Sequence, residues 1–234
     1  MFSRGLTVAG LTLVGAIGLG AVAQGTAQAA VVLLPKPVAS VIGDSYTSGL
    51  TGTGPITTTS TPWYTATVAD LGWKLGTVVA DPGGGYRHPG GSGTFAQAVR
   101  ARPVDPSSSY VIIEGGLNDA LLPDATGEQQ AVRELVALVH TQAPRARVIL
   151  LGAVRPPAAG ASLQAQAEAI HAEAVAEALI WEDGRQCSFE AAADGIHPTQ
   201  SGHRQIGDWT AAKLQTRSDN GATLHRSPQG WWTV

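Results

Sequence analysis

The hydrophobic residues of this chain form two kinds of pattern that alternate along most of its length. Unbroken apolar runs, typical of buried parallel strands, occupy residues 38–42, 77–80, 110–114, 147–154 and 178–181. Helical patterns separate them at residues 63–73 (closed by Gly76), 94–100, 128–141, 162–179 and 200–214. Strands that alternate with helices predict an α/β fold, in which a parallel sheet of about five strands is covered on both faces.

Polar, glycine-containing segments follow three of the predicted strands. They are Gly43-Asp44-Ser45, the glycine-rich loop 81–93 and Gly116-Leu117-Asn118-Asp119. Ligands of open α/β sheets bind beyond the carboxyl ends of the strands. We therefore expect the three segments to converge at one edge of the sheet.

The first 29 residues have the order of a secretory signal peptide. Arg4 supplies a positive charge, residues 6–23 are uncharged and mostly apolar, and Ala27-Gln28-Ala29 offers a cleavage site. The sequence predicts cleavage after Ala29, export from the cytoplasm and no stable membrane span afterwards; an uncleaved anchor is the alternative.

Residues 30–234, about 205 residues, have the length of a single domain with a full hydrophobic core. Its core covers about 38–214, and a polar tail occupies 217–234. The scattered Lys and Arg residues do not indicate nucleic-acid binding. The single cysteine, Cys187, is interpreted as a small, partly buried apolar residue.

The segment Asp194-Gly195-Ile196-His197-Pro198 carries the most informative chemistry. An aspartate three residues before a histidine can reach its Nδ1 atom, which directs Nε2 outward to a serine. Ser45 follows a predicted strand at a turn and is the candidate nucleophile. Taken singly, each segment is better explained as an ordinary loop or turn.

Two further segments suit the oxyanion of acyl transfer. The Asn118 side-chain amide can donate to a developing negative charge, and so can backbone N–H groups of the glycine loop. An Asx turn at Asn118 and plain loop flexibility are the alternatives.

The four segments occur in the order Ser, Gly, Asn, His, and with them the chain resembles the SGNH (GDSL-type) hydrolases from about residue 38 to 214. The resemblance implies a flavodoxin-like three-layer α/β/α sandwich and a serine esterase without cofactor or metal. It assigns the nucleophile to Ser45 and its two partners to Asp194 and His197. The oxyanion hole falls on Ser45, Gly83 and Asn118, with Gly84 or Gly85 as register alternatives for Gly83.

The chain departs from the family pattern at two positions. Tyr46 stands where leucine is usual, which we expect to alter the pocket wall, and Asp81 stands where asparagine is common. A metal site built from Asp194, His197 and His203 is disfavoured, because the catalytic set of Ser45, Asp194 and His197 already accounts for two of these three residues.

The expected function is hydrolysis of small-molecule or polymer carboxylic esters. A deacetylase of carbohydrates or cell-wall polymers is the first alternative, and a non-catalytic secreted binding module is the second.

Overall fold

A five-stranded parallel sheet forms the centre of the fold in this computed structural model. The strands are β1 (Val38–Gly43), β2 (Lys74–Ala80), β3 (Tyr110–Gly115), β4 (Arg147–Gly152) and β5 (Ile180–Glu182). Their order is β2-β1-β3-β4-β5, and all neighbours are parallel. The sequence-based prediction of a parallel α/β sheet is confirmed.

The structure describes residues 35–52, 59–154, 162–219, 222–223, 225–226 and 232–233. The expected signal peptide with its Ala27-Gln28-Ala29 site lies outside these residues.

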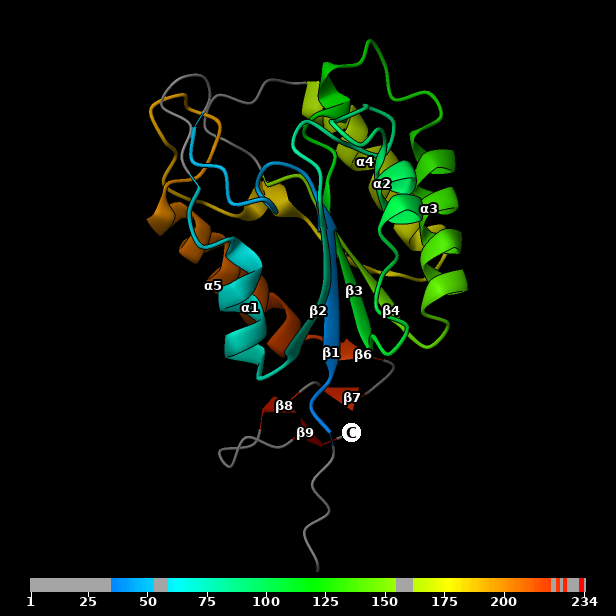
Figure 1. Ribbon diagram of the computed structural model, residues 1–234, viewed down its shortest axis with the longest axis vertical. Coiled ribbons are helices and arrows are strands. Elements are labelled where there is room, and N and C mark those ends of the chain that lie inside the picture. The colour runs from blue at the N-terminus through cyan, green and yellow to red at the C-terminus, as the bar shows by residue number, and fades with distance from the viewer. Residues whose placement is uncertain are drawn as a thin grey trace, which may run out of the picture. The chain divides into compact units, whose positions relative to one another are not determined.

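Helices cover both faces of the sheet and complete three layers (Figure 1). On one face lie α1 (Trp63–Leu71) and α5 (Gln200–Thr216), which pack against each other. On the other lie α2 (Phe95–Ala101), α3 (Glu128–Gln142) and α4 (Ser162–Ala176). Two clusters of buried apolar side chains, one on each face, form the core. This is the expected α/β/α sandwich.

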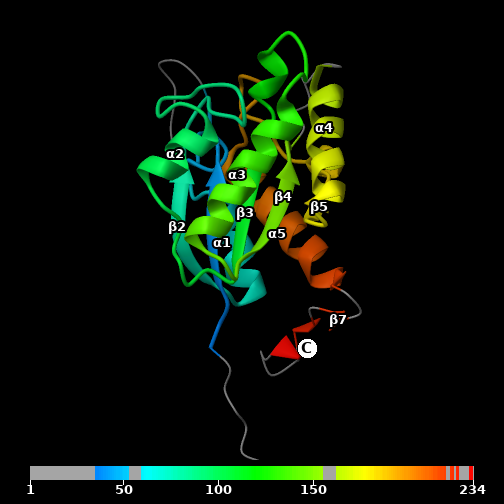
Figure 2. The ribbon, with the colours of Figure 1, turned by 90° about the vertical axis from the view of Figure 1, so that its right-hand side faces the viewer.

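The chain order reverses between β1 and β3, because β2 lies on one side of β1 and β3 lies on the other. The strands run in one direction, so their carboxyl ends share one edge of the sheet (Figure 2). Ligands of such sheets bind at the reversal point. Ser45 follows β1 there, and Asn118 follows β3.

Two predicted helix ends differ from the structure. Helix α1 ends at Leu71 rather than near Gly76, because Gly72 adopts the left-handed conformation (φ 68°) that closes helices. Gly76 instead lies within β2, which therefore begins earlier than predicted. Helix α4 ends at Ala176, just before Ala178 turns the chain with φ 52°.

The polar C-terminal segment contains two short antiparallel strand pairs. Strand β6 (Ser218–Asp219) pairs with β7 (Ala222–Thr223), and β8 (His225–Arg226) pairs with β9 (Trp232–Thr233). Within the described part of the chain, no helix combines the length and apolar character needed to cross a bilayer.

Candidate active site

The turn after β1 presents Ser45 at the reversal point of the sheet. Gly43 permits this turn because a Cβ atom there would lie 2.9 Å from the backbone oxygen of Glu114. The turn closes with the N–H of Leu50 donating to the Ser45 carbonyl at 3.0 Å. No acceptor among the described residues takes the N–H of Ser45 itself. Within the described part of the chain, the N–H of Ser45 therefore remains available to donate to a substrate oxygen.

The loop before α5 brings His197 to this serine. The Nε2 atom of His197 lies 3.0 Å from Ser45 Oγ, and Nδ1 lies 2.7 Å from Asp194 Oδ2. A carboxylate only accepts hydrogen bonds, so Nδ1 carries the proton and the lone pair of Nε2 faces the hydroxyl. The structure thus brings together the three residues that the sequence singled out.

Asp194 is held by its own loop as well as by the imidazole. Its Oδ1 atom accepts the backbone N–H groups of Ile196 and His197, both at 3.0 Å. Partial burial raises the pKa of Asp194, but the hydrogen bonds from His197 and from the two N–H groups outweigh it and leave this pKa below its ordinary value. Asp194 is therefore an anion that fixes the orientation of His197.

The Asn118 side chain lies between the nucleophile turn and the glycine loop. Its Nδ2 atom donates to the Gly84 carbonyl at 2.8 Å and to Asp44 Oδ2 at 3.2 Å. Asp44, in turn, accepts the N–H of Tyr46 at 2.9 Å. Both amide hydrogens of Asn118 therefore have acceptors in the structure.

Asp119, next to Asn118, organises the glycine loop. Its buried carboxylate accepts three consecutive backbone N–H groups, from Tyr86, Arg87 and His88, at 2.7–3.0 Å. A Cβ atom on Gly85 would come within 2.7 Å of Asp119 Cγ, so this close approach requires glycine. The sequence pattern Gly-x-Asn-Asp contains Asp119, but its backbone partners could not be inferred from it.

The three glycines considered for the oxyanion hole differ in their N–H groups. Those of Gly84 and Gly85 donate to the carbonyls of Asp81 and His88, both at 2.8 Å. Gly83 has φ 79°, and no acceptor for its N–H is found in the described ranges. Hydrogen bonding therefore favours Gly83 over the two register alternatives.

Tyr46 does not form a pocket wall, contrary to the expectation from sequence. Only 1% of its surface is exposed, and its hydroxyl donates to the carbonyl of Ile196, next to His197. Its ring packs at 5.9 Å from the His197 ring and at 5.8 Å, edge to face, from Phe189. Burial raises the pKa of Tyr46 far above its usual range, so the phenol remains a donor. The residue thus connects the nucleophile turn to the histidine loop.

Cys187 and His203, which the sequence analysis also considered, are both buried in the fold. Cys187 is buried, and burial raises the pKa of its thiol to about 12, as suits an apolar residue. His203 is also buried, with Nε2 3.1 Å from the Leu50 carbonyl, and burial lowers its pKa. Among the residues that the structure describes, no group of three His, Cys, Asp or Glu is arranged to hold a metal ion.

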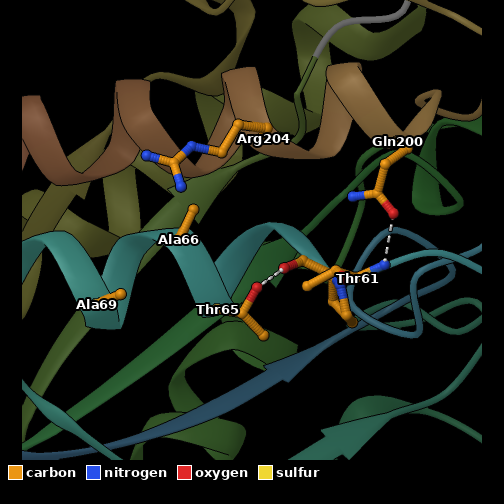
Figure 3. A pocket seen from close by; sticks show the side chains of 7 residues that line it. Thr61, Thr65, Ala66, Ala69, Gln200 and Arg204 are labelled. Atoms are coloured by element: carbon orange, nitrogen blue, oxygen red, sulfur yellow. Dashed lines mark hydrogen bonds between the residues drawn. The ribbon is translucent and has the colours of Figure 1, made fainter.

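A hollow of about 270 Å³ lies between α1 and α5 (Figure 3). It is lined by Thr61, Pro62, Thr65, Ala66, Ala69, Gln200 and Arg204. The Thr61 N–H donates to Gln200 Oε1 at 3.0 Å, and Arg204 pairs with Asp208 at 2.7 Å. Its polar groups are largely satisfied internally, and it contains none of the candidate catalytic residues.

Comparison with known proteins defines the class to which this fold and site belong. Residues 41–205 match the GDSL-like Lipase/Acylhydrolase family. The chain belongs to this family and is a carboxylic ester hydrolase. It is 31% identical over 186 residues to a GDSL lipase from Mycobacterium tuberculosis, an alignment that covers 74% of this chain and 79% of the relative.

Solved structures of esterases share the fold. A carbohydrate acetylesterase from Sinorhizobium meliloti superposes with a TM-score of 0.62 at 18% identity, over 76% of this chain and 98% of that one. An aryl esterase from M. smegmatis superposes with a TM-score of 0.59 at 19% identity, over the same two shares. At these identities the likeness concerns the fold alone.

Proposed function

We propose that this hydrolase cleaves carboxylic esters through an acyl-enzyme on Ser45, with His197 as base and Asp194 as its partner. One observation carries the proposal. The hydroxyl, the imidazole and the carboxylate form a continuous hydrogen-bonded chain, with 3.0 Å between Ser45 and His197 and 2.7 Å between His197 and Asp194.

Ser45 Oγ attacks the ester carbonyl carbon while its proton passes to Nε2 of His197. The imidazolium that forms is stabilised by the Asp194 carboxylate, which keeps the Nδ1–H bond. When the tetrahedral intermediate collapses, Nε2 returns the proton to the departing alcohol. Water then attacks the acyl-enzyme and gives a proton to Nε2 of His197. When this second tetrahedral intermediate collapses, the bond to Ser45 Oγ breaks, Nε2 returns the proton to Oγ, and the acid is released.

The carbonyl oxygen gains a negative charge during each attack. We assign its stabilisation to the N–H groups of Ser45 and Gly83 and to the Asn118 amide. In the structure one Asn118 hydrogen is donated to the neutral Gly84 carbonyl. A charged oxyanion is a stronger acceptor than a neutral carbonyl. We therefore expect Asn118 to donate this hydrogen to the oxyanion, while its other hydrogen stays bonded to Asp44.

A panel of esters tests the activity and its substrate class together. It contains p-nitrophenyl esters of increasing acyl length, an aryl acetate and acetylated sugars, since relatives and neighbours include a lipase, an aryl esterase and a carbohydrate acetylesterase. The Ser45→Ala variant is the control. Turnover by wild type and not by the variant supports the proposal, and preference for acetylated sugars would favour the deacetylase alternative. Equal activity of wild type and Ser45→Ala would refute the proposed role of Ser45.

We further propose that the protein is exported and cleaved after Ala29, on the basis of Arg4, the apolar run and Ala27-Gln28-Ala29. N-terminal sequencing of protein from the culture medium of an expressing host is expected to begin at Ala30. Recovery only in the membrane fraction, with Met1 retained, would contradict export.

A further inference from the structure

Glu114 is a buried carboxyl group to which the proposed mechanism gives no role. It lies near the end of β3, at the centre of the sheet, and only 1% of its surface is exposed. The hydroxyl of Thr47 donates to Glu114 Oε2 at 3.2 Å, and Trp63 Nε1 donates to that hydroxyl at 3.3 Å. An acidic side chain in an otherwise apolar strand is costly to bury unless it is neutral or paired.

The partner of Glu114 is a second buried acid, Asp44. The two carboxyl groups are close enough to interact directly, and a hydrogen bond between them is possible only when one of them holds a proton. Burial is the main cause that raises the pKa of both acids, that of Asp44 to about 7 and that of Glu114 well above its ordinary value. Two N–H donors of the described residues stabilise a charge on Asp44, whereas one hydroxyl faces Glu114, so Glu114 is the group that keeps the proton. Asp44 is then a carboxylate that also accepts the Tyr46 N–H and one hydrogen of Asn118.

The groups that face this pair favour the protonated state of Glu114. Desolvation is the main cause that raises the pKa of Glu114, followed by the charge of Asp44. The neighbouring ionisable groups are the acid Asp119 beside Asn118 and the phenols Tyr46 and Tyr86, on the nucleophile turn and the glycine loop. None of these three groups carries a positive charge that would stabilise a second carboxylate.

We propose that Glu114 is a positioning residue of the esterase: as a neutral acid it donates to Asp44, and Asp44 holds the Asn118 amide where the oxyanion forms. This inference rests on the proposed function. The connection runs from Glu114 through the 0% exposed Asp44 to Asn118 Nδ2 at 3.2 Å. Loss of the proton would place two carboxylates in contact, and their repulsion would displace the acceptor that Asn118 uses.

Two variants separate this role from simple packing. Glu114→Gln keeps a neutral donor for Asp44 and an acceptor for the Thr47 hydroxyl, so its kcat at pH 7 is expected to remain close to wild type. Glu114→Leu removes both groups, and its kcat is expected to fall roughly 10- to 100-fold, the effect of a small misplacement of a reacting group. KM is expected to change far less, because the oxyanion donor acts mainly in the transition state.

The pH profile gives a second test that does not require the leucine variant to fold. In wild type, kcat is expected to decline at alkaline pH as the shared proton is lost. Glu114→Gln has no such proton, so its activity should extend further into the alkaline range. The free energy of unfolding should also favour Glu114→Gln over wild type at alkaline pH. Glu114 disfavours its own ionisation in the folded state, so glutamine should stabilise the protein increasingly as pH rises above the ordinary pKa of glutamate.

Three results would overturn the inference in an active enzyme. They are a wild-type kcat in Glu114→Leu, a kcat in Glu114→Gln as low as in Glu114→Leu, and identical alkaline limbs in Glu114→Gln and wild type. An inactive wild type, or a Ser45→Ala variant that retains activity, would instead show that the proposed function itself is wrong.

Discussion

His197 Nε2 lies 3.0 Å from Ser45 Oγ, although 152 positions separate the two residues in the chain. The contact depends on two turns that close at the same edge of the sheet, one after β1 and one before α5. It places an unprotonated ring nitrogen against a hydroxyl, which is the starting geometry for acyl transfer.

Activity is expected to fall in acid, because protonation of His197 removes the lone pair that accepts the serine proton. The lowered pKa of Asp194 keeps that residue ionised while His197 gains its proton, so protonation of Asp194 does not contribute to the acid limb. The profile of kcat/KM against pH measures this. A rate that stays flat from neutral pH far into the acid range would argue against a histidine base.

Asp194→Asn should lower kcat roughly 10,000-fold, because an amide that donates to Nδ1 selects the wrong tautomer of His197. Asparagine keeps the Oδ1 acceptor for the N–H groups of Ile196 and His197, so the loop should remain intact. Asp194→Ala loses that acceptor as well and should also lower the melting temperature. If Asp194→Asn retains most of its kcat, Asp194 is not the partner of His197.

Asn118→Ala should lower kcat about 100- to 1000-fold with a much smaller change in KM, as is typical for an oxyanion donor. Asn118→Asp should be at least as severe, since its carboxylate would face Asp44 and the Gly84 carbonyl as well as the oxyanion. Comparison of kcat, KM and melting temperature in both variants distinguishes catalysis from turn formation. Near-normal kcat in Asn118→Asp would exclude Asn118 from the site.

Most of the fold followed from sequence because the strands are continuous apolar runs. Strand β3, predicted at residues 110–114, spans Tyr110–Gly115. The end of α1 was misplaced because Gly72 and Gly76 are equally plausible helix terminators in the sequence, and the conformation of Gly72 decides between them.

The candidate site was predictable where its partners lie close in sequence. The three-residue spacing of Asp194 and His197 indicated their hydrogen bond, which the structure contains. The bonds from Asp119 to the glycine loop span 31–33 positions and involve backbone N–H groups, which leave no signature in side-chain identity. Glu114 ends an apolar run, and nothing in the sequence indicated that it pairs with Asp44.

Tyr46→Phe should show how much the hydrogen bond between the nucleophile turn and the histidine loop contributes to stability and to kcat. It removes the donor to the Ile196 carbonyl and leaves the ring in place, so the expected loss is about 1 kcal/mol of unfolding free energy. A moderate decrease in kcat should accompany it, because the bonded carbonyl adjoins His197. Leucine is the usual residue at this position in SGNH hydrolases, and Tyr46→Leu should lose more stability than Tyr46→Phe. Chemical denaturation of the three proteins gives the comparison, and equal stability of Tyr46→Phe and wild type would show that the bond contributes little.

The central claim is that Ser45 is a nucleophile activated by His197, and covalent labelling with a fluorophosphonate tests it most directly. Intact-mass analysis of the labelled protein should show one adduct per chain, and peptide mapping should place it on Ser45. Ser45→Ala should remain folded and unlabelled, with kcat lower by several orders of magnitude. Labelling of Ser45→Ala at the wild-type rate, or a wild-type protein that hydrolyses esters without being labelled at Ser45, would contradict the account.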